Sequence, residues 1–324
     1  MEQIEMCITS RCNLSCKHCY QHFEKNKYEL DKEKIINLIN YAISRGTKTI
    51  ILSGGEATLH PNYYEILNFL NNLNVDVTLV TNATLIKTEL LKELSKDRFK
   101  FVISIDGNEK HHDERRGNGM YKKTLANLQK IKELGFKTKA NITIDVNNYH
   151  DIPELLEINY FDEFSFMPVG YAGAAAMNNM TTYDEDFEKV VEYIYNISND
   201  KCLKRHCSIY PKSISIKYNG DVFPCSLARD YGLLKMGNLY EKSIEEICND
   251  FEKTNNYECV KSASTKKNIQ KCNNCKVKNC YRGCRVRALK FFGDLNMPDP
   301  FSCKLNNQGF ENISYSKIYW GEKQ

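Results

Sequence analysis

The feature that most constrains the fold is a regular alternation of strand-like and helix-like segments in the first two-thirds of the chain. Short apolar runs predict strands, and longer segments with apolar residues three and four positions apart predict helices. The predicted strands cover residues 4–9, 49–53, 75–80, 101–105, 137–144 and 163–168. The predicted helices lie between Asp31 and Gly46 and over residues 61–73, 88–95, 120–134, 152–158 and 184–199.

Six repeats of strand and helix predict an α/β fold in which the strands are parallel and the helices lie outside the sheet. We expect a partial (β/α)6 barrel of the TIM type, whose chemistry lies at the carboxyl ends of the strands. A doubly wound open sheet is the competing architecture. It usually has a glycine-rich phosphate turn after the first strand, whereas this chain has a cysteine-rich loop there.

The composition limits where the protein works and what it binds. The 324 residues suffice for one large domain and a smaller one. The net charge of +4 is too small to suggest a protein that coats nucleic acid. No membrane segment or signal peptide is visible, so we expect a cytoplasmic protein. In that compartment the fourteen cysteines are expected to be metal ligands or reactive thiols rather than disulfides.

Three cysteines, Cys12, Cys16 and Cys19, follow the first predicted strand. A structural zinc or an ordinary iron–sulfur cluster needs four protein ligands. Three neighbouring thiolates therefore leave two alternatives, which are a distant fourth ligand or an iron left open for another molecule. Half of a zinc site is the simpler interpretation of the triplet taken alone.

Four later segments, which lie at or beyond the ends of predicted strands, add to this loop. They are Gly54-Gly55-Glu56, the stretch around Asn82, the stretch Ser104-Ile105-Asp106-Gly107, and His112-Asp113-Glu114-Arg115-Arg116-Gly117. With the cysteine loop they resemble the radical S-adenosylmethionine (radical SAM) superfamily, whose signature is Cx3CxφC with an aromatic at φ, here His18. The chain departs from the family pattern at Ala57, where proline is usual, and at Ala83, where glycine is usual.

This resemblance implies that Cys12, Cys16 and Cys19 bind a 4Fe-4S cluster whose open iron holds S-adenosylmethionine (SAM). Reductive cleavage of SAM would then release a 5'-deoxyadenosyl radical. The residues implied in cofactor binding are His18, Gly54, Gly55, Glu56, Asn82, Ser104, Asp106 and Arg116. Without the family, Asp106 would be part of an Asp-Gly turn and Arg116 a solvated surface charge.

A second cysteine-rich region begins at Cys202. Asn219-Gly220 between two apolar runs predicts a β-hairpin, and cysteines lie on both sides of it. The region resembles the SPASM extension of radical SAM proteins, which carries two auxiliary 4Fe-4S clusters, although the spacing before Cys280 is one residue short. By the family's connectivity, the first cluster would take Cys207, Cys225 and Cys284, with Cys202 as a fourth ligand or with an open iron for substrate. The second cluster would take Cys272, Cys275, Cys280 and Cys303.

The remaining cysteines are Cys7, Cys248 and Cys259. Cys7 and Cys248 lie among apolar residues and are expected in the core. Cys259 lies in a polar stretch, and we consider it a candidate hydrogen-atom donor. Residues 261–290 hold ten lysines or arginines and no acidic residue, which suits neighbouring anionic clusters but also an RNA-binding zinc ribbon.

The resemblance predicts three parts: a radical SAM partial barrel over residues 1–200, a SPASM domain over 201–305, and a tail over 306–324. We expect an enzyme with three 4Fe-4S clusters and SAM that oxidises, crosslinks or epimerises a ribosomally made peptide or protein. Ser226 stands where sulfatase-maturing members have aspartate, which disfavours that activity.

The expected partners are the substrate peptide and a flavodoxin- or ferredoxin-type electron donor. Because only eleven residues precede Cys12, a leader peptide would be recognised by a separate leader-peptide-binding protein or by the barrel and SPASM surfaces, or its recognition would be unnecessary. Neither a membrane nor a nucleic acid is expected. The alternatives are a radical SAM enzyme for a small molecule such as a porphyrin or carbohydrate, and a non-catalytic iron–sulfur or zinc protein.

Overall fold

The structure, a computed structural model, describes residues 1–20, 27–169, 173–178, 180, 189–190, 193, 208–263, 269, 272–277, 283–306 and 312. In this part of the chain nine strands form one sheet with the order β6-β5-β4-β3-β2-β1-β7-β8-β9. The strands are β1 (Gln3–Cys7), β2 (Thr49–Ser53), β3 (Asp76–Thr81), β4 (Phe99–Ser104), β5 (Lys137–Ile144), β6 (Glu163–Pro168), β7 (Ser213–Ile216), β8 (Asp221–Phe223) and β9 (Gly237–Asn238). The six predicted strands are confirmed.

The helices of the first half are α1 (Lys32–Ser44), α2 (Tyr63–Asn71), α3 (Glu109–Arg116), α4 (Met120–Glu133), α5 (Ile152–Leu156) and α6 (Gly173–Met177). Those of the second half are α8 (Ser226–Tyr231), α9 (Ile244–Glu252), α10 (Asn255–Ala263), α11 (Arg285–Phe292) and α12 (Pro300–Leu305). Three 3-10 turns are η1 (Ala57–Leu59), η2 (Thr88–Leu91) and η3 (Tyr149–Asp151). The helix predicted over 88–95 is only the short turn η2, and most of the helix predicted over 184–199 lies outside the described residues.

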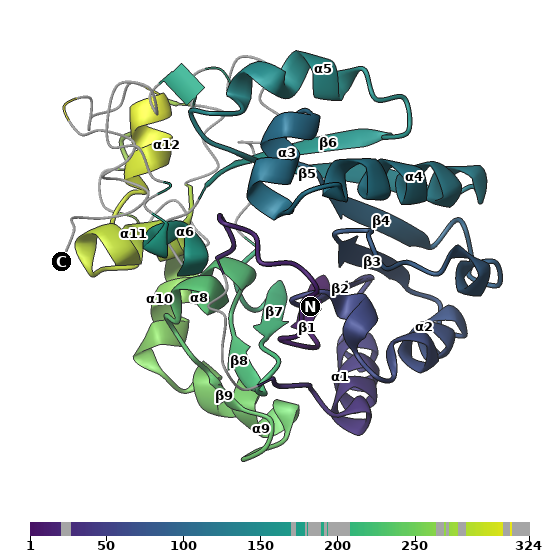
Figure 1. Ribbon diagram of the computed structural model, residues 1–324. Coiled ribbons are helices and arrows are strands. Elements are labelled where there is room, and N and C mark those ends of the chain that lie inside the picture. The colour runs from purple at the N-terminus through teal and green to yellow at the C-terminus, as the bar shows by residue number, and fades with distance from the viewer. Residues whose placement is uncertain are drawn as a thin grey trace.

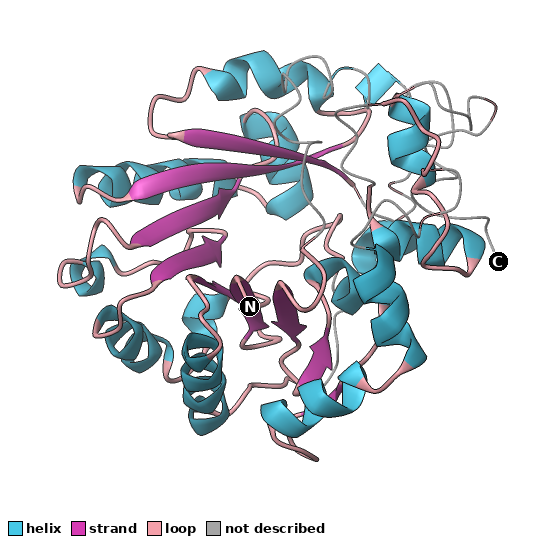
Figure 2. Ribbon diagram, turned by 180° about the vertical axis from the view of Figure 1, so that it is seen from behind, coloured by secondary structure: helices cyan, strands magenta, loops and turns pink. Residues whose placement is uncertain are grey.

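The sheet curves into an open arc, and α1, α2 and α4 cover its outer side (Figure 1). Strands β1 to β6 pair in parallel, as a partial β/α barrel requires. Seen from behind, the strands follow one another around this arc (Figure 2). The predicted barrel of parallel strands is therefore confirmed.

Alternation along the strands separates an apolar outer face from a polar inner face. In β1, Ile4 and Met6 are fully buried in the main core, whereas Glu5 between them is only partly buried. The same alternation places Phe101 and Ile103 of β4 in the core and the partly buried Ser104 on the opposite face. Other partly buried or polar inner-face residues are Thr78, Lys100, Lys139, Asn141, Thr143, Ser165, Ser213 and Ser215. A polar concave face suits a bound polar molecule better than a second packed layer.

The predicted hairpin around Asn219-Gly220 is present as β7 and β8, which pair antiparallel. The sequence did not predict where it lies. Strand β7 pairs in parallel with β1, so the hairpin continues the barrel sheet beyond its first strand. The boundary expected after residue 200 falls outside the described residues.

No helix among the described residues combines the length and the apolar character needed to cross a membrane.

Candidate functional site

The cysteine loop begins at the carboxyl end of β1 and lies directly against the glycines that follow β2. The carbonyl oxygen of Thr9 accepts a hydrogen bond from the amide of Gly55 at 2.8 Å, and that of Arg11 accepts one from the amide of Glu56 at 2.7 Å. A Cβ atom on Gly55 would lie 2.4 Å from the Arg11 carbonyl oxygen. We expected these glycines to make room for SAM. The structure shows a direct requirement for glycine at position 55, because the backbone of the cysteine loop occupies the space that a side chain would fill.

The carboxylate of Glu56 joins the ends of β2 and β3. It is buried and accepts hydrogen bonds from the Thr81 hydroxyl at 2.7 Å, the Asn82 amide at 2.8 Å and the Thr58 hydroxyl at 2.9 Å. Burial raises the pKa of this carboxyl above its ordinary value. These contacts support the strand ends that surround the cysteine loop, and contact of Glu56 with SAM stays a prediction.

The side chain of Asn82 connects the end of β3 to the cysteine loop. Its amide nitrogen donates to Asn13 Oδ1 at 3.0 Å, and its oxygen accepts from the hydroxyl of Thr84 at 2.6 Å. Asn13 in turn donates to the Thr84 hydroxyl at 2.9 Å. Ala83, which replaces the usual glycine, has φ +61, a left-handed conformation that glycine adopts with less strain. Ala83 therefore has a backbone conformation of the kind that glycine usually provides.

A buried group of charged and aromatic side chains lies beneath Cys16. Asp106 is fully buried, and its Oδ2 accepts from Nε of Arg116 at 2.6 Å while its Oδ1 accepts from the amide of Thr143 at 3.0 Å. The positive charges of Arg116 and its neighbours hold the pKa of Asp106 below its ordinary value despite burial. Arg116 also places Nη1 4.0 Å from the sulfur of Cys16 and Nη2 3.3 Å from Nε2 of His18. Asp106, Arg116 and His18, predicted from separate motifs, thus form one cluster.

The neighbouring Arg115 is buried as well. It pairs with the buried Asp145 and donates to the carbonyl oxygen of Thr143 at 2.8 Å, while its own carbonyl oxygen accepts from the amide of Lys17 at 3.0 Å. Neither arginine is therefore the solvated surface charge that their sequence position alone would suggest. Both tie α3 to the cysteine loop, and sequence reasoning missed the role of Arg115.

The three cysteine thiols differ in their surroundings. Cys16 is buried, and Cys12 and Cys19 are partly buried. Burial raises the pKa of Cys12 to about 11 and also raises the pKa of Cys16, with the nearby Arg116 acting in the opposite direction for both. Thiolates at these positions need compensating positive charge, and a metal cluster together with Arg116 would supply it.

The groups around the three cysteines determine whether the loop fits an iron–sulfur cluster. Within the described ranges no three His, Cys, Asp or Glu side chains stand close enough together to bind a metal as they are. The loop nevertheless has matching features. Three thiols lie within eight residues, an N–H of Arg116 faces Cys16, and the Leu14 amide is 3.4 Å from the sulfur of Cys12. In addition, Nδ1 of His18 is buried and has no hydrogen-bond partner in the described part of the chain. These donors suit an anionic cluster.

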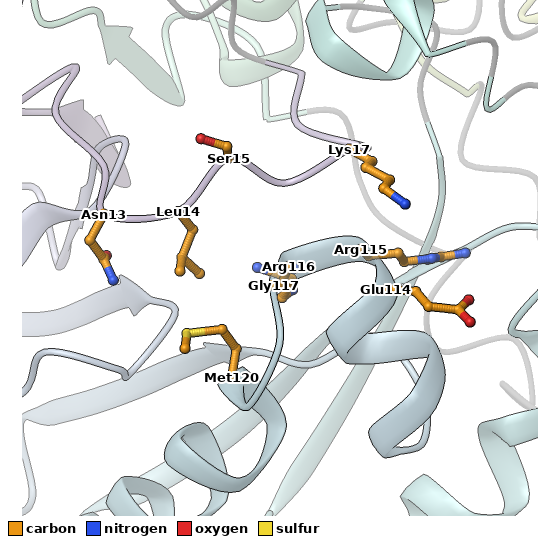
Figure 3. A pocket seen from close by; sticks show the side chains of 9 residues that line it. All are labelled: Asn13, Leu14, Ser15, Lys17, Glu114, Arg115, Arg116, Gly117 and Met120. Atoms are coloured by element: carbon orange, nitrogen blue, oxygen red, sulfur yellow. The ribbon is translucent and has the colours of Figure 1, made fainter.

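A cavity of about 330 Å³ lies between the cysteine loop and the turn from α3 to α4. It is lined by Asn13, Leu14, Ser15, Lys17, Glu114, Arg115, Arg116, Gly117 and Met120. Figure 3 shows Leu14 and Met120 on facing walls, with Lys17, Arg115 and Glu114 toward one end. None of the three cysteines lines the cavity, but several of its wall residues are sequence neighbours of Cys12 and Cys16.

The second cysteine region is described in part, because Cys202, Cys207 and Cys280 lie outside the described residues. Cys225 precedes α8 and accepts from the amide of Ala228 at 3.4 Å. Cys225, Cys259 and Cys284 all border one apolar cluster, separate from the main core. Cys259 is half-buried there, with the amide of Asn296 3.7 Å from its sulfur, rather than being a freely exposed thiol. Cys272, Cys275 and Cys303 are partly buried, and Cys7 and Cys248 are buried as expected.

Asp299 holds two of these cysteine segments together. Its buried carboxylate accepts from the amide of Cys284 at 2.7 Å and from Nη2 of Arg287 at 2.7 Å. Its carbonyl oxygen accepts from the amide of Cys303 at 3.0 Å. Sequence reasoning did not single out Asp299, although an acidic residue just before Pro300 is a recognisable helix N-cap.

A further charged group lies on the inner face and was missed. Nη1 of Arg229, on α8, donates to Glu5 Oε1 at 2.8 Å and to the Ser215 hydroxyl at 3.0 Å, and its Nε donates to Asp230 at 2.9 Å. Burial, with Glu5 nearby, raises the pKa of Asp230 to about 6, against the effect of Arg229. No local motif marks these residues, because strand pairing alone brings them together.

With this geometry established, comparison with known families identifies both regions. The family model of the radical SAM superfamily matches residues 6–158, and that of the SPASM iron–sulfur cluster-binding domain matches residues 207–276. The chain contains a radical SAM domain. Its SPASM domain follows the barrel, and the two domains imply iron–sulfur clusters and SAM binding.

Individual relatives differ in what they do. The AdoMet-dependent heme synthase of Methanosarcina barkeri is 25% identical, and the match covers 91% of this chain and 94% of that protein. The subtilosin biosynthesis protein AlbA of Bacillus subtilis is 27% identical over 75% of this chain and 58% of that protein. Among solved structures, Streptococcus suis SuiB bound to its precursor peptide SuiA aligns with a TM-score of 0.71 and 20% identity, covering 93% of this chain and 75% of SuiB. This last likeness concerns the fold.

Proposed function

We propose that this radical SAM enzyme modifies a ribosomally made peptide or protein by hydrogen abstraction from an unactivated carbon. Cys12, Cys16 and Cys19 would hold a 4Fe-4S cluster. When bound, that cluster with SAM supplies an electron to the sulfonium and so delivers a 5'-deoxyadenosyl radical. The observation that carries the proposal is the convergence of the three-cysteine loop with Asp106, Arg116 and His18 at the carboxyl ends of the barrel strands.

The chain's own residues have definable tasks in this reaction. The backbone contacts at Gly55 and Glu56 fix the cysteine loop, and Asp106 holds the guanidinium of Arg116 against Cys16. Ser104 lies on the inner face of β4, where it would contact SAM under the proposal. The polar inner face would then hold the substrate within reach of the radical.

The SPASM cysteines would bind two auxiliary clusters, which makes three in all. Cys225 and Cys284 border the same apolar cluster, which supports their assignment to one auxiliary site. Cys272, Cys275 and Cys303, with Cys280, would serve the other. We keep Cys202 as the fourth ligand of the first auxiliary cluster and Cys259 as a candidate hydrogen-atom donor, both as proposals.

Support for a peptide substrate comes from AlbA, a bacteriocin biosynthesis protein, and from SuiB, whose structure contains a precursor peptide. A flavodoxin- or ferredoxin-type electron donor and a separate leader-peptide-binding protein remain the proposed partners. A porphyrin is the second candidate substrate. One observation favours it: the heme synthase relative matches over 94% of its own length, whereas AlbA matches over 58%.

The central test is anaerobic reconstitution with iron and sulfide, followed by SAM and a strong reductant. We expect 5'-deoxyadenosine from the wild type and none from a variant with Cys12, Cys16 and Cys19 all changed to alanine. That variant should keep roughly two-thirds of the iron if three independent clusters are present. Well-loaded wild-type protein that yields no 5'-deoxyadenosine would refute the proposal.

The substrate class needs a separate test. The loaded enzyme is incubated with SAM and either iron-coproporphyrin or short peptides encoded beside its gene, and each substrate's mass is followed. A peptide-specific mass change, or deuterium transfer from a labelled peptide into 5'-deoxyadenosine, supports the first candidate. Conversion of the porphyrin alone would replace it with the second.

A further inference from the structure

The side chain of His18 is a largely enclosed titratable group inside the cysteine loop. It lies between Cys16 and Cys19 in sequence and is only 8% exposed. A neutral imidazole carries one hydrogen, and its position decides which nitrogen donates.

The contact with Arg116 fixes that position. Nη2 of Arg116 lies 3.3 Å from Nε2 of His18 with the geometry of a hydrogen bond, and a guanidinium only donates. Nε2 must therefore be the acceptor, and the hydrogen must be on Nδ1. Asp106 Oδ2 is also 3.3 Å from Nε2, but it meets the distance of an ion pair only and instead accepts from Nε of Arg116.

Nδ1 of His18 is buried and has no hydrogen-bond partner among the described residues. An unpaired buried donor costs about 1–3 kcal/mol, so such groups normally have a partner in the working protein. The contact with Arg116 disfavours the alternatives, because a flipped ring would present the Cε1–H to the guanidinium and the other tautomer would present an N–H. The orphan donor is thus held in place by a buried ion pair.

We propose that the Nδ1–H of His18 donates a hydrogen bond to an anionic acceptor that enters the cysteine loop with the cofactors. Two sources share this chemistry: a sulfur atom of the 4Fe-4S cluster, and the carboxylate of SAM. This inference rests on the proposed function, because it requires a cluster on Cys12, Cys16 and Cys19. It adds a specific role for the residue at the aromatic position of the loop.

The two sources predict different measurements. A hydrogen bond to a cluster sulfur stabilises the reduced cluster and raises its reduction potential. A hydrogen bond to the SAM carboxylate leaves that potential unchanged and strengthens SAM binding, by about tenfold for a typical charge-assisted bond.

Three substitutions distinguish the effect of losing the hydrogen-bond donor from the effect of losing the aromatic ring. His18→Asn places an amide nitrogen near the position of Nδ1, His18→Gln places one near Nε2, and His18→Phe keeps an aromatic ring without a donor. Each full-length variant is reconstituted, and its iron content is compared with the wild type. The midpoint potential of the SAM-responsive cluster is measured by a redox titration followed by electron paramagnetic resonance. SAM affinity is measured by equilibrium dialysis with labelled SAM.

Under the cluster alternative, the Phe and Gln variants have a lower midpoint potential and the Asn variant retains the wild-type value. Under the SAM alternative, the Phe and Gln variants bind SAM about tenfold more weakly at an unchanged potential, and the Asn variant again resembles the wild type. If the Phe variant fails to load iron, the comparison of Asn with Gln still decides. An Asn variant as impaired as the Gln variant, or full equivalence of all variants with the wild type, overturns the inference. Failure of the wild type itself to load a SAM-responsive cluster would instead refute the proposed function.

Discussion

Replacing Gly55 with alanine should displace the cysteine loop without touching any cysteine. The added Cβ would lie 2.4 Å from the carbonyl oxygen of Arg11, 2.7 Å from its carbonyl carbon and 2.8 Å from the carbonyl oxygen of Ser10. Real Cβ atoms essentially never approach a neighbour closer than 3.0 Å, so the backbone must move by at least about 0.6 Å. All three atoms belong to the backbone of the loop, which cannot yield by a change of rotamer.

The magnitude follows from the contacts that would be strained. The hydrogen bonds from the amides of Gly55 and Glu56 to the loop would lengthen, which costs about 1 kcal/mol of stability for each bond. Overpacking typically costs about 1–3 kcal/mol more. We therefore expect a loss of about 3–5 kcal/mol in the free energy of unfolding, measured by urea titration. A displacement of this size at a reacting centre can lower a rate by up to about 100-fold, and we expect a comparable loss of 5'-deoxyadenosine formation.

Gly46→Ala is the matched control. Gly46 has φ +78, so alanine there is strained by about 1–2 kcal/mol, but no atom lies within 4 Å of its Cβ. We expect this variant to be less stable than the wild type, to load its clusters normally and to cleave SAM at the wild-type rate. A Gly55→Ala variant with the same iron content and cleavage rate as Gly46→Ala would refute the argument that the glycine accommodates the loop backbone.

Two further substitutions test the charged groups. Asp106→Asn should lower the free energy of unfolding by about 3–5 kcal/mol, because the buried guanidinium of Arg116 loses its counter-charge. The control is Lys122→Ala, which removes an exposed ion pair and should leave the free energy of unfolding unchanged in the same urea titration. Equal effects of the two would contradict the buried pair. The folded-state pKa of Asp230, about 6, lies above its ordinary value of 3.8, so the folded state holds this proton more tightly. The free energy of unfolding should therefore fall as the pH rises from about 4 to about 6, by at most about 3 kcal/mol. Asp230→Asn, which keeps an acceptor for Arg229, should remove that fall, and an unchanged pH profile would show that Asp230 does not cause it.

The sequence predicted the elements that depend on local pattern. The six barrel strands, the helix after Asp31 and the Asn219-Gly220 hairpin all follow from periodicity and turn chemistry, and the structure contains them. It did not predict α3, because residues 109–116 are almost wholly polar and show no apolar stripe. Helix α3 forms instead because Asn108 caps it and because Arg115 and Arg116 reach buried partners.

The site residues show the same division. The motifs located Asp106, Arg116 and His18 separately, but only the fold shows that they contact one another. The contribution of Gly55 to the loop was equally hidden, since a close backbone approach leaves no trace in composition beyond the glycine itself. The Glu5–Arg229 pair joins residues 224 positions apart in the chain. No sequence pattern reports such a distant pairing, because it depends on which strand lies beside β1.

That neighbour of β1 bears on how the two cysteine regions communicate. Strand β7 is hydrogen-bonded to β1, the strand that leads into the Cys12–Cys19 loop, and β8 leads directly to Cys225. The Glu5–Arg229 pair adds a buried contact across the same junction. The SPASM hairpin therefore cannot move away from the barrel without breaking backbone pairing and exposing this ion pair. Strand pairing therefore sets the position of Cys225 relative to the strand that leads into the Cys12–Cys19 loop.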